Sequence, residues 1–352
     1  MRGESEKIMS EKSRIITGDA LNVLTKIPDN HIDCCITSPP YYGLRDYGVA
    51  GQIGLEETPS EYIEKLVAVF REVRRILKND GTLWLNMGDS YAGSGKGRNA
   101  DGTAYQDDSI FGIRNAQMGG IIQNSTNIEY KRKDLMGIPW RLAFALQADG
   151  WYLRQDIIWY KPNCMPESVK DRCTKSHEYI FLLGKSDKYY FDYEAIKEPA
   201  VGFNNIPPAG SKGTSRLNSR RRKGNSKTFR GGAYINNQVF NNSGDIIRGS
   251  HGNTENTTGL RNKRDVWSVS TQGCKDAHFA TFPEKLVEPC ILAGCRSGGT
   301  VLDPFIGSGT TAVVAAKNGR RYIGIELNPD YADIALKKIK EVEQVEKGSA
   351  EY

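Results

Sequence analysis

The chain has 352 residues, of which 38% are hydrophobic and 26% are charged, and its formal net charge is +6. This composition allows a sizeable buried core and excludes a disordered chain. The sequence contains no apolar run of the roughly 20 residues that a membrane-spanning helix needs, and residues 1–12 are too polar for a secretory signal.

Seven cysteines are scattered along the chain, and none of them forms a C-x-x-C pair. Because structural zinc sites use such pairs and disulfide frameworks use an even count, we expect neither a metal site nor disulfides. A reduced, cytoplasmic location is the simplest interpretation. The cysteines occupy positions 34, 35, 164, 173, 274, 290 and 295.

The N-terminal part alternates between strand-like and helix-like patterns. Hydrophobic runs predict strands at 13–17, 32–37 and 82–86. Between the last two runs, apolar residues recur at three- and four-residue steps, which is typical of an amphipathic helix. A Thr-Pro start at Thr58 and an Asn-Asp-Gly turn at 79–81 bound this helix.

The rest of the chain continues this alternation. It predicts helices at 134–147, capped by Asp134, and at 283–293, 307–317 and 329–342. Strands alternating with helices indicate an α/β domain with a mainly parallel sheet. The further strands are expected at 153–159, 179–183, 188–191, 266–269, 300–303 and 321–326.

Two segments lack hydrophobic periodicity. Residues 88–129 are rich in Gly, Ser, Asn and Asp and predict a long mobile loop. Residues 201–264 carry eight Arg and four Lys against one Asp and one Glu, so the rest of the chain has a small acidic excess. This asymmetry favours a polyanionic partner, with a solvated basic loop as the alternative.

A glycine-containing turn follows the expected strand at 300–303. In Asp303-Pro304-Phe305-Ile306-Gly307-Ser308-Gly309-Thr310, glycines would let the backbone approach a ligand, and the following helix N-terminus favours polar or anionic groups. Glu326 ends the next strand and can accept hydrogen bonds from both ribose hydroxyls of a nucleoside. The third glycine of the dinucleotide pattern is absent, which favours a nucleoside cofactor smaller than NAD.

A second motif, Thr37-Ser38-Pro39-Pro40-Tyr41, follows the strand at 32–37. The two prolines fix the backbone, Ser38 supplies a hydroxyl and Tyr41 a flat ring. A carbonyl, a hydroxyl and a ring together could hold a planar base. Considered alone, the motif favours an ordinary turn that ends a strand.

The two motifs together resemble those of the DNA amino-methyltransferases that use S-adenosylmethionine. Their order, with Ser-Pro-Pro-Tyr at 38–41 before Asp-Pro-Phe-x-Gly-x-Gly at 303–309, resembles the beta class of that family. The similarity runs from about residue 15 to 339 and is weak at 88–129 and 201–264. The segments 159–163, 171–172, 177–179 and 278–283 are similar to further motifs of the family.

The resemblance implies a Rossmann-like methyltransferase whose mainly parallel, twisted sheet is flanked by helices. It divides the chain into a catalytic part at 13–200, a basic target-recognition insert at 201–264 and a cofactor-binding part at 265–345. It also implies double-stranded DNA as partner, with a separately acting restriction endonuclease, and leaves monomer and homodimer open.

The resemblance also assigns roles to individual residues. Asp303 would lie beside the methionine part of the cofactor or orient the loop. Lys161, Asp171, Arg172 and Glu178 belong either to the site or to structural ion pairs. Catalysis is assigned to Ser38, Pro39, Pro40 and Tyr41, cofactor binding to Asp19, Asp303, Phe305, Gly307, Gly309, Thr310 and Glu326, and DNA binding to Arg220, Arg221, Arg222, Lys223 and Arg230.

The implied reaction transfers a methyl group from S-adenosylmethionine to the exocyclic amino group of a flipped base. In this family, Ser at position 38 favours cytosine N4, and adenine N6 is the alternative. Two other interpretations are a methyltransferase for RNA or a small molecule, and a catalytically silent DNA-binding relative. Cys290, although preceded by Pro289 as in the ring-carbon cytosine methyltransferases, is expected to pack inside a helix.

Overall fold

The computed structural model describes residues 13–92, 130–131, 133–200, 259–271 and 282–349. The chain divides into two compact units, Met1–Ile196 with Arg264–Tyr352 and, separately, Lys197–Lys263. The described part of the smaller unit is a two-stranded antiparallel ribbon, β6 (Glu198–Pro199) and β7 (Leu260–Arg261). In this ribbon, Arg261 Nε donates a hydrogen bond to Glu198 Oε1 at 2.9 Å.

The larger unit is built on an eight-stranded sheet with the order β1-β10-β9-β2-β3-β5-β4-β8. All neighbouring strands are parallel except β5, which runs antiparallel to both β3 and β4. The expectation of a mainly parallel sheet is therefore confirmed. The strands are β1 (Arg14–Thr17), β2 (Ile32–Thr37), β3 (Leu77–Met87), β4 (Tyr152–Tyr160), β5 (His177–Gly184), β8 (Val266–Ser268), β9 (Thr300–Asp303) and β10 (Arg321–Glu326).

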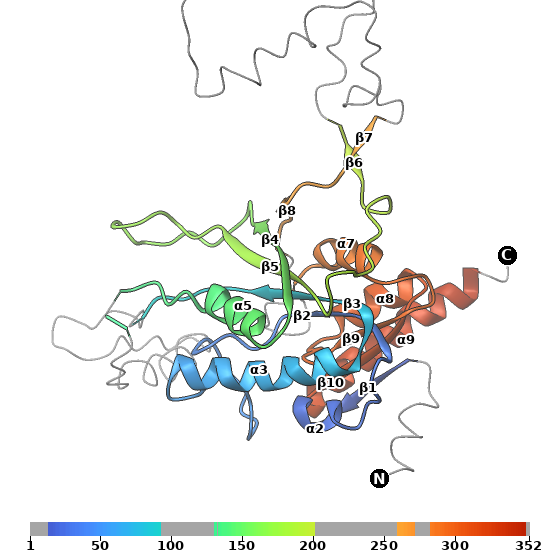
Figure 1. Cartoon of the computed structure of the whole chain (residues 1–352), viewed down its shortest axis with the longest axis horizontal. Helices are drawn as coiled ribbons and strands as arrows, with labels where there is room; N and C mark the ends of the chain where they lie inside the picture. Colours follow the sequence, from blue (N-terminus) through green and yellow to red (C-terminus); the bar gives the residue numbers. More distant parts are fainter. Residues whose placement is uncertain (1–12, 93–129, 132, 201–258, 272–281, 350–352) are drawn as a thin grey trace, which may run out of the picture. The chain divides into compact units, whose positions relative to one another are not determined.

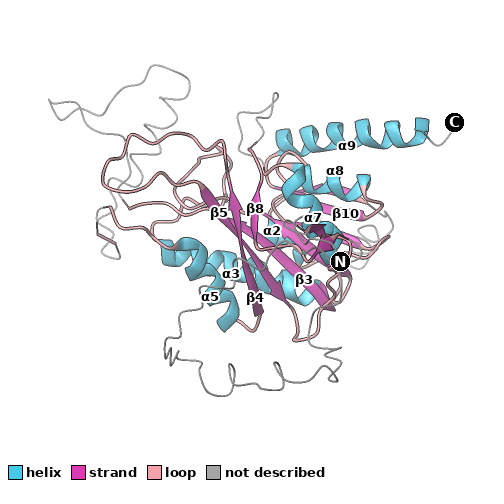
Figure 2. Ribbon diagram, turned by 90° about the horizontal axis from the view of Figure 1, so that it is seen from above, coloured by secondary structure: helices cyan, strands magenta, loops and turns pink. Residues whose placement is uncertain are grey.

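Helices cover both faces of this sheet (Figures 1 and 2). The side chains of β2 alternate between two hydrophobic layers: Cys35 packs in one layer, and Cys34 and Ile36 pack in the other. The first layer is completed by α2 (Ala20–Leu24), α3 (Pro59–Ile76) and α5 (Ile138–Ala148), and the second by α7 (Glu284–Gly294), α8 (Thr310–Lys317) and α9 (Pro329–Ser349).

The sheet has a topological switch point between β9 and β2. The connection from β2 to β3 runs through α3 on one face, whereas the connection from β9 to β10 runs through α8 on the other face. In open α/β sheets, ligands bind beyond the carboxyl ends of the strands at such a point. The fold thus places a binding crevice after Thr37 of β2 and Asp303 of β9.

The helix α3 follows its sequence pattern closely. Thr58 is the N-cap, and its hydroxyl accepts a hydrogen bond from the Glu61 amide at 3.1 Å. The helix ends at Ile76, but the expected turn at 79–81 lies inside β3. There the pairing with β2 jumps from Ile32–Leu77 to Cys34–Thr82. The Asn-Asp-Gly sequence therefore marks an irregularity within a strand.

Two expected helix starts and one expected strand are also wrong. The helix predicted from Asp134 begins at Ile138, because Pro139 marks its first turn. The helix predicted from 307 begins at Thr310, since two glycines form the turn before it. Residues 188–191 form no strand. Tyr189 and Phe191 pack against the second hydrophobic layer instead, and Phe191 stacks on Trp84 with ring centroids 6.1 Å apart.

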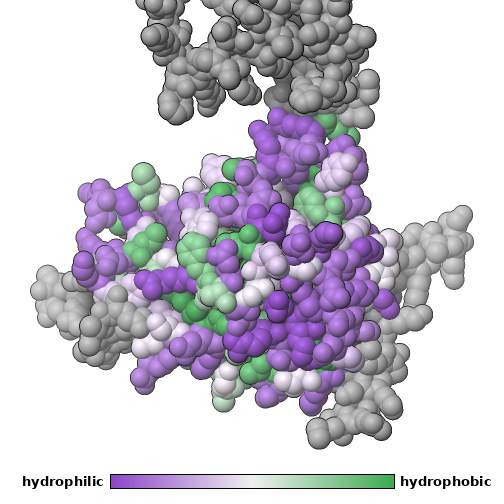
Figure 3. Space-filling view, viewed as in Figure 1, coloured by the Kyte–Doolittle hydropathy of each residue, from purple (hydrophilic) through white to green (hydrophobic). Residues whose placement is uncertain are grey.

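No helix in the described ranges is long and apolar enough to cross a membrane. The face of the molecule in Figure 3 is mainly hydrophilic, and its hydrophobic residues gather in patches among the hydrophilic ones. Isolated apolar side chains of this kind are normal at a protein surface.

Gly309 is the position where turn and helix packing are most tightly coupled. Its φ is 91°, and a Cβ added there would lie 2.9 Å from Ala335 Cβ on α9. We expect Gly309→Ala to lower the free energy of unfolding by about 2 kcal/mol or more, through backbone strain and overpacking. Denaturant unfolding measures the change.

Gly319→Ala is the matched control. Its φ is 66°, but an added Cβ would meet no atom within 4 Å. This variant should therefore lose only the part of the free energy of unfolding that comes from backbone strain. Equal destabilisation by both substitutions would contradict the proposed contact between the turn and α9.

Candidate active site

A cavity of about 240 Å³ opens beyond the carboxyl ends of β1, β2, β9 and β10, where the topology places the crevice. It brings together the two sequence motifs, which are separated by most of the chain. Its lining includes Gly18, Asp19, Ser38, Pro39, Pro40, Tyr41, Asn86, Trp159, Lys161, Glu178, Pro304, Phe305, Gly307, Ser308, Thr310 and Glu326.

Asp303 holds the glycine turn and the Ser-Pro-Pro-Tyr turn together. Its Oδ1 accepts hydrogen bonds from the Thr37 hydroxyl at 2.6 Å and from the Phe305 amide at 3.0 Å. Its Oδ2 accepts one from the Thr311 hydroxyl at 2.6 Å. Burial raises the pKa of Asp303 to about 6, against the effect of these three donors. Asp303 is not among the cavity-lining residues, so its geometry fits orientation of the loop.

Glu326 lies at the end of β10, opposite the glycine turn. Its Oε2 accepts a hydrogen bond from the Gly307 amide at 2.8 Å, and its Oε1 accepts one from the Asn328 amide at 2.9 Å. Burial raises its pKa, whereas these backbone donors act to lower it. Each carboxylate oxygen can accept a further hydrogen bond, so Glu326 can still receive two hydroxyl groups from the cavity.

The turn between β9 and α8 has room and an unused polar group for a ligand. A Cβ added at Gly307 would meet no atom within 4 Å. Ser308 is 7% exposed, and within the described ranges its Oγ has no hydrogen-bond partner. A buried hydroxyl without a partner is costly unless a ligand or water satisfies it. Phe305 and Thr310 also line this part of the cavity.

Asp19 reaches the cavity from the other side of β10. It is the N-cap of α2, and its Oδ1 accepts a hydrogen bond from the Asn22 amide at 2.9 Å. Gly18 donates its amide to the Glu326 carbonyl at 2.8 Å, so the start of α2 is fixed to the end of β10. The structure therefore brings Asp19 and Glu326 to one cavity, as the sequence predicts.

The Ser-Pro-Pro-Tyr turn leaves β2 and is held by α3. The Tyr62 hydroxyl donates a hydrogen bond to the Pro40 carbonyl at 2.8 Å. The ring of Tyr41 lies against Gly88, where an added Cβ would come within 2.6 Å of Tyr41 Cε2. The backbone of the turn and the ring of Tyr41 are thus fixed independently, while Ser38 and Pro39 face the cavity.

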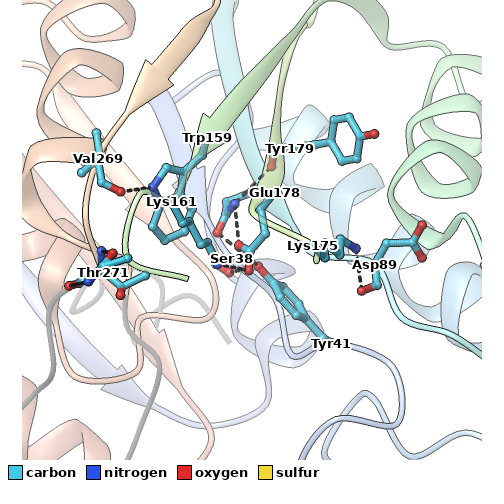
Figure 4. Close-up of polar contacts among 12 residues, drawn as sticks. Ser38, Tyr41, Asp89, Trp159, Lys161, Lys175, Glu178, Tyr179, Val269 and Thr271 are labelled. Atoms are coloured by element: carbon cyan, nitrogen blue, oxygen red, sulfur yellow. Dashed lines mark hydrogen bonds and ion pairs between the residues drawn. The ribbon is translucent and has the colours of Figure 1, made fainter. Parts of the chain in front are cut away.

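Ser38, Tyr41 and Glu178 form a connected series of polar contacts (Figure 4). The Ser38 hydroxyl donates to the Tyr41 phenol oxygen at 3.4 Å, and the phenol donates to Glu178 Oε2 at 2.9 Å. Burial, followed by the charge of Glu178, raises the pKa of Tyr41 well above its usual value. The phenol therefore keeps its proton at physiological pH.

Glu178 is held from two further directions. Its Oε1 pairs with Lys161 Nζ, and its Oε2 accepts a hydrogen bond from Asn86 Nδ2 at 3.3 Å. The Lys161 ammonium lies 4.2 Å from the ring centroid of Trp159. All four residues line the cavity, so the ion pair between Lys161 and Glu178 belongs to the site.

Asp171 and Arg172 belong instead to surface ion pairs. Asp171 pairs with Lys133 at 2.7 Å, and Arg172 pairs with Glu167. Neither Asp171 nor Arg172 lines the cavity. Of the two interpretations that the sequence left open for these residues, their geometry supports the structural one.

Another carboxylate, that of Asp89, anchors the segment after β3. It accepts hydrogen bonds from the amides of Gly137 and Ile138, both at 3.1 Å, and so satisfies the start of α5. The Lys175 ammonium donates to the Asp89 carbonyl at 2.7 Å, and burial lowers the pKa of Lys175 (Figure 4). These contacts hold the connection between β4 and β5 beside the site.

Asn86, Trp159 and Ser308 also line the cavity, although the sequence did not assign them to the site. Asn86 is polar and 5% exposed near the carboxyl end of β3, after three hydrophobic residues, a position that could have indicated function. Trp159 begins the segment 159–163, which is similar to a further motif of the family, and Ser308 lies within the glycine turn, but neither residue was singled out for a role. Gly309 does not line the cavity; it caps α8. The predicted DNA contacts Arg220, Arg221, Arg222, Lys223 and Arg230 lie outside the described residues.

Characterised relatives cover nearly the whole chain. The Type II methyltransferase M.Cfr9I of Citrobacter freundii is 42% identical over 336 residues, which span 96% of this chain and 90% of that protein. The Type II methyltransferase M.SmaI of Serratia marcescens is 44% identical over 326 residues, which span 93% and 90% of the respective chains.

Solved structures agree on the fold. The PvuII DNA methyltransferase (cytosine-N4-specific) matches with a TM-score of 0.55 at 16% identity, over 94% of this chain and 90% of that one. A Thermus thermophilus protein that was solved in complex with S-adenosyl-L-methionine matches with a TM-score of 0.51 at 22% identity, over 94% of both chains. The family model for N6 and N4 DNA methylases matches residues 32–337, and this chain belongs to that family.

Proposed function

We propose that the chain transfers a methyl group from S-adenosylmethionine to the exocyclic amino group of a DNA base that has been flipped out of the duplex, with cytosine N4 as the preferred target. The observation that carries this proposal is the shared cavity. It is lined both by the Ser-Pro-Pro-Tyr turn and by the turn at Gly307 with Glu326. The smaller unit, Lys197–Lys263, corresponds closely to the basic segment that we assign to target recognition.

The residues present fit a nucleoside cofactor. Glu326 has acceptor capacity left for two ribose hydroxyls, Ser308 offers an unsatisfied hydroxyl, and Phe305 offers an aromatic surface. S-adenosylmethionine supplies a methyl group on a positively charged sulfur, which is activated for direct transfer. Asp303 fixes the turn on which these groups are placed, because its three hydrogen bonds connect β2, the turn and α8.

The Ser-Pro-Pro-Tyr turn offers acceptors for an amino group. The lone pair of an exocyclic amino nitrogen is delocalised into its ring, so the nitrogen is a poor nucleophile. Hydrogen bonds from its two protons to Ser38 Oγ and to the Pro39 carbonyl would favour a pyramidal nitrogen with an exposed lone pair. The Pro40 carbonyl already accepts a hydrogen bond from the Tyr62 hydroxyl, so we assign this task to the Pro39 carbonyl. Catalysis then consists of positioning and electrostatics.

The target base must leave the duplex to reach this cavity. Tyr41 presents a ring whose hydroxyl and edge are both fixed, and a fixed ring is a suitable stacking surface for a base. Both cytosine and adenine carry an amino group next to a ring nitrogen, so the geometry admits both. The preference for cytosine N4 rests on Ser38, and adenine N6 is the alternative. A separate restriction endonuclease and a monomeric or homodimeric state stay expectations from the sequence.

The proposed ribose contact is tested by Glu326→Ala. The substitution should weaken binding of S-adenosylmethionine by about 1–3 kcal/mol, the loss of charge-assisted hydrogen bonds. Calorimetry measures the affinity. The control Glu284→Ala removes a carboxylate of α7 that pairs with Lys317 outside the cavity. Unchanged affinity in Glu326→Ala would refute the placement of the ribose.

The target base is tested by product analysis. DNA methylated by the enzyme is digested to nucleosides, and mass spectrometry should find N4-methylcytosine. Methyladenine without N4-methylcytosine would overturn the choice of base but leave the amino-methyltransferase function intact.

The role of Ser38 is tested separately by Ser38→Ala. This variant should transfer methyl groups more slowly while binding the cofactor almost unchanged, because the lost acceptor serves the reacting amino group. Ser186→Ala is the control, since its hydroxyl lies 2.7 Å from each of two carbonyl oxygens, either of which can accept its proton, and does not line the cavity. Equal rates in wild type and Ser38→Ala would exclude the acceptor role.

The DNA-binding role of the basic segment is tested by replacing Arg220, Arg221 and Arg222 with Ala. The slope of log K against log salt should become shallower by up to about three units if all three contact phosphate. A triple Ala variant at Lys65, Arg71 and Lys317 makes the same change of charge at surface ion pairs. If the two variants bind DNA alike, the arginine cluster is a solvated loop.

A further inference from the structure

We propose that Glu178 is a positioning residue that acts through Tyr41 to hold Ser38 as a hydrogen-bond acceptor for the substrate amino group. The inference rests on the proposed function, because it concerns the same cavity. It extends that function from the Ser-Pro-Pro-Tyr turn to an ion pair, Glu178 with Lys161, that comes from β5 and the end of β4.

The hydrogen bonds from Ser38 to Tyr41 and from Tyr41 to Glu178 have a defined direction of proton donation. A tyrosine hydroxyl has one proton to donate, and its oxygen can accept others. The nearest acceptor for the Tyr41 proton is Glu178 Oε2 at 2.9 Å; Asn86 Oδ1 lies farther away, at 3.2 Å. With its proton engaged there, the Tyr41 oxygen can accept the proton of Ser38, which lies 3.4 Å away. Such a long contact is common in a site without substrate and can shorten when substrate binds.

This direction decides what Ser38 offers to the cavity. When its proton points at Tyr41, the lone pairs of Ser38 Oγ are left for a donor in the cavity. An amino group presents donors, so it would meet a matching acceptor. If the series ran in the opposite direction, Tyr41 would donate to Ser38, and the serine proton would face the amino protons. The orientation of one hydroxyl thus separates a productive site from an unproductive one.

The carboxylate of Glu178 is what favours the productive direction. A carboxylate is an acceptor only, so it cannot donate a proton back to Tyr41. Lys161 pairs with its other oxygen, and Asn86 donates to the oxygen that Tyr41 uses. The side chains of Lys161 and Glu178 are 18% and 16% exposed, so the pair is largely screened from water. Figure 4 shows Tyr41 and Glu178 directed at each other beside Ser38.

The substitution Glu178→Gln keeps the shape of the side chain but reverses the direction of its hydrogen bond with Tyr41. An amide nitrogen in place of Oε2 would donate to the Tyr41 oxygen and so compete with Ser38 for it. We expect the rate of methyl transfer at saturating substrates to fall by about tenfold, in the range of couplings within one hydrogen-bond network. Binding of S-adenosylmethionine should stay within about twofold of wild type, which also reports that the variant is folded.

A double-mutant cycle isolates the route through Tyr41. Wild type, Glu178→Gln, Tyr41→Phe and the double variant are compared in single-turnover transfer of a labelled methyl group to DNA. Phe lacks the hydroxyl, so the connection between residues 178 and 38 is already broken. Glu178→Gln should therefore cost about tenfold in the wild-type background and less than about twofold in the Tyr41→Phe background.

Glu167→Gln is the matched control, because Glu167 pairs with Arg172 in the same connection between β4 and β5 but does not line the cavity. It should leave the rate unchanged. A rate in Glu178→Gln equal to wild type would overturn the inference, as would additive losses in the double variant. Neither outcome affects the proposed function. That function would fail instead if wild type transferred no methyl group to DNA.

Discussion

The hydrogen bond between the Thr37 hydroxyl and Asp303 Oδ1 connects the two halves of the site across 266 positions of sequence. Thr37 directly precedes the Ser-Pro-Pro-Tyr turn, and Asp303 directly precedes the glycine turn. Burying this carboxylate has a cost, which the hydrogen bonds only partly offset: the pKa of Asp303 rises from 3.8 to about 6, which corresponds to roughly 3 kcal/mol. Because the folded-state pKa lies above the unfolded value, this penalty is complete above about pH 6 and absent below about pH 4.

The neighbouring strands β2 and β9 are joined by carboxylates at both ends. Their ladder is short, with Cys34 paired to Val301 and Cys35 to Leu302. At its amino end, Asp33 Oδ2 accepts a hydrogen bond from the Thr300 amide at 2.9 Å, and Asp33 Oδ1 accepts one from Lys78 at 2.8 Å. At its carboxyl end, Asp303 binds Thr37. The switch point of the sheet, where a crevice must open, is therefore also the place where polar side chains supplement the backbone pairing.

The sequence predicted those features of the fold that depend on interactions within a single helix or strand. The strand β2 was predicted with its observed bounds, and α3 with its cap at Thr58, because hydrophobic periodicity and capping act within one element. The motif residues reached one cavity because parallel strands place their carboxyl ends at one edge. The predicted start of α5 was wrong, because the backbone amides at its true start are satisfied by Asp89, which is distant in sequence. The partnership of Glu178 with Tyr41, across 137 positions, likewise has no local signature.

The buried carboxylates of the site have two different roles: one connects parts of this chain, and the other can also bind a ligand. Asp303 accepts from three donors of this chain, and its role there is complete without a ligand. Glu326 accepts backbone amides on both oxygens and keeps acceptor capacity directed at the cavity. Glu178 lies between these cases, since a cation neutralises one of its oxygens and a phenol uses the other. A carboxylate can therefore bind a ligand only if some of its lone pairs are not used by this chain. Burial alone would wrongly indicate Asp303 as the ligand-binding carboxylate.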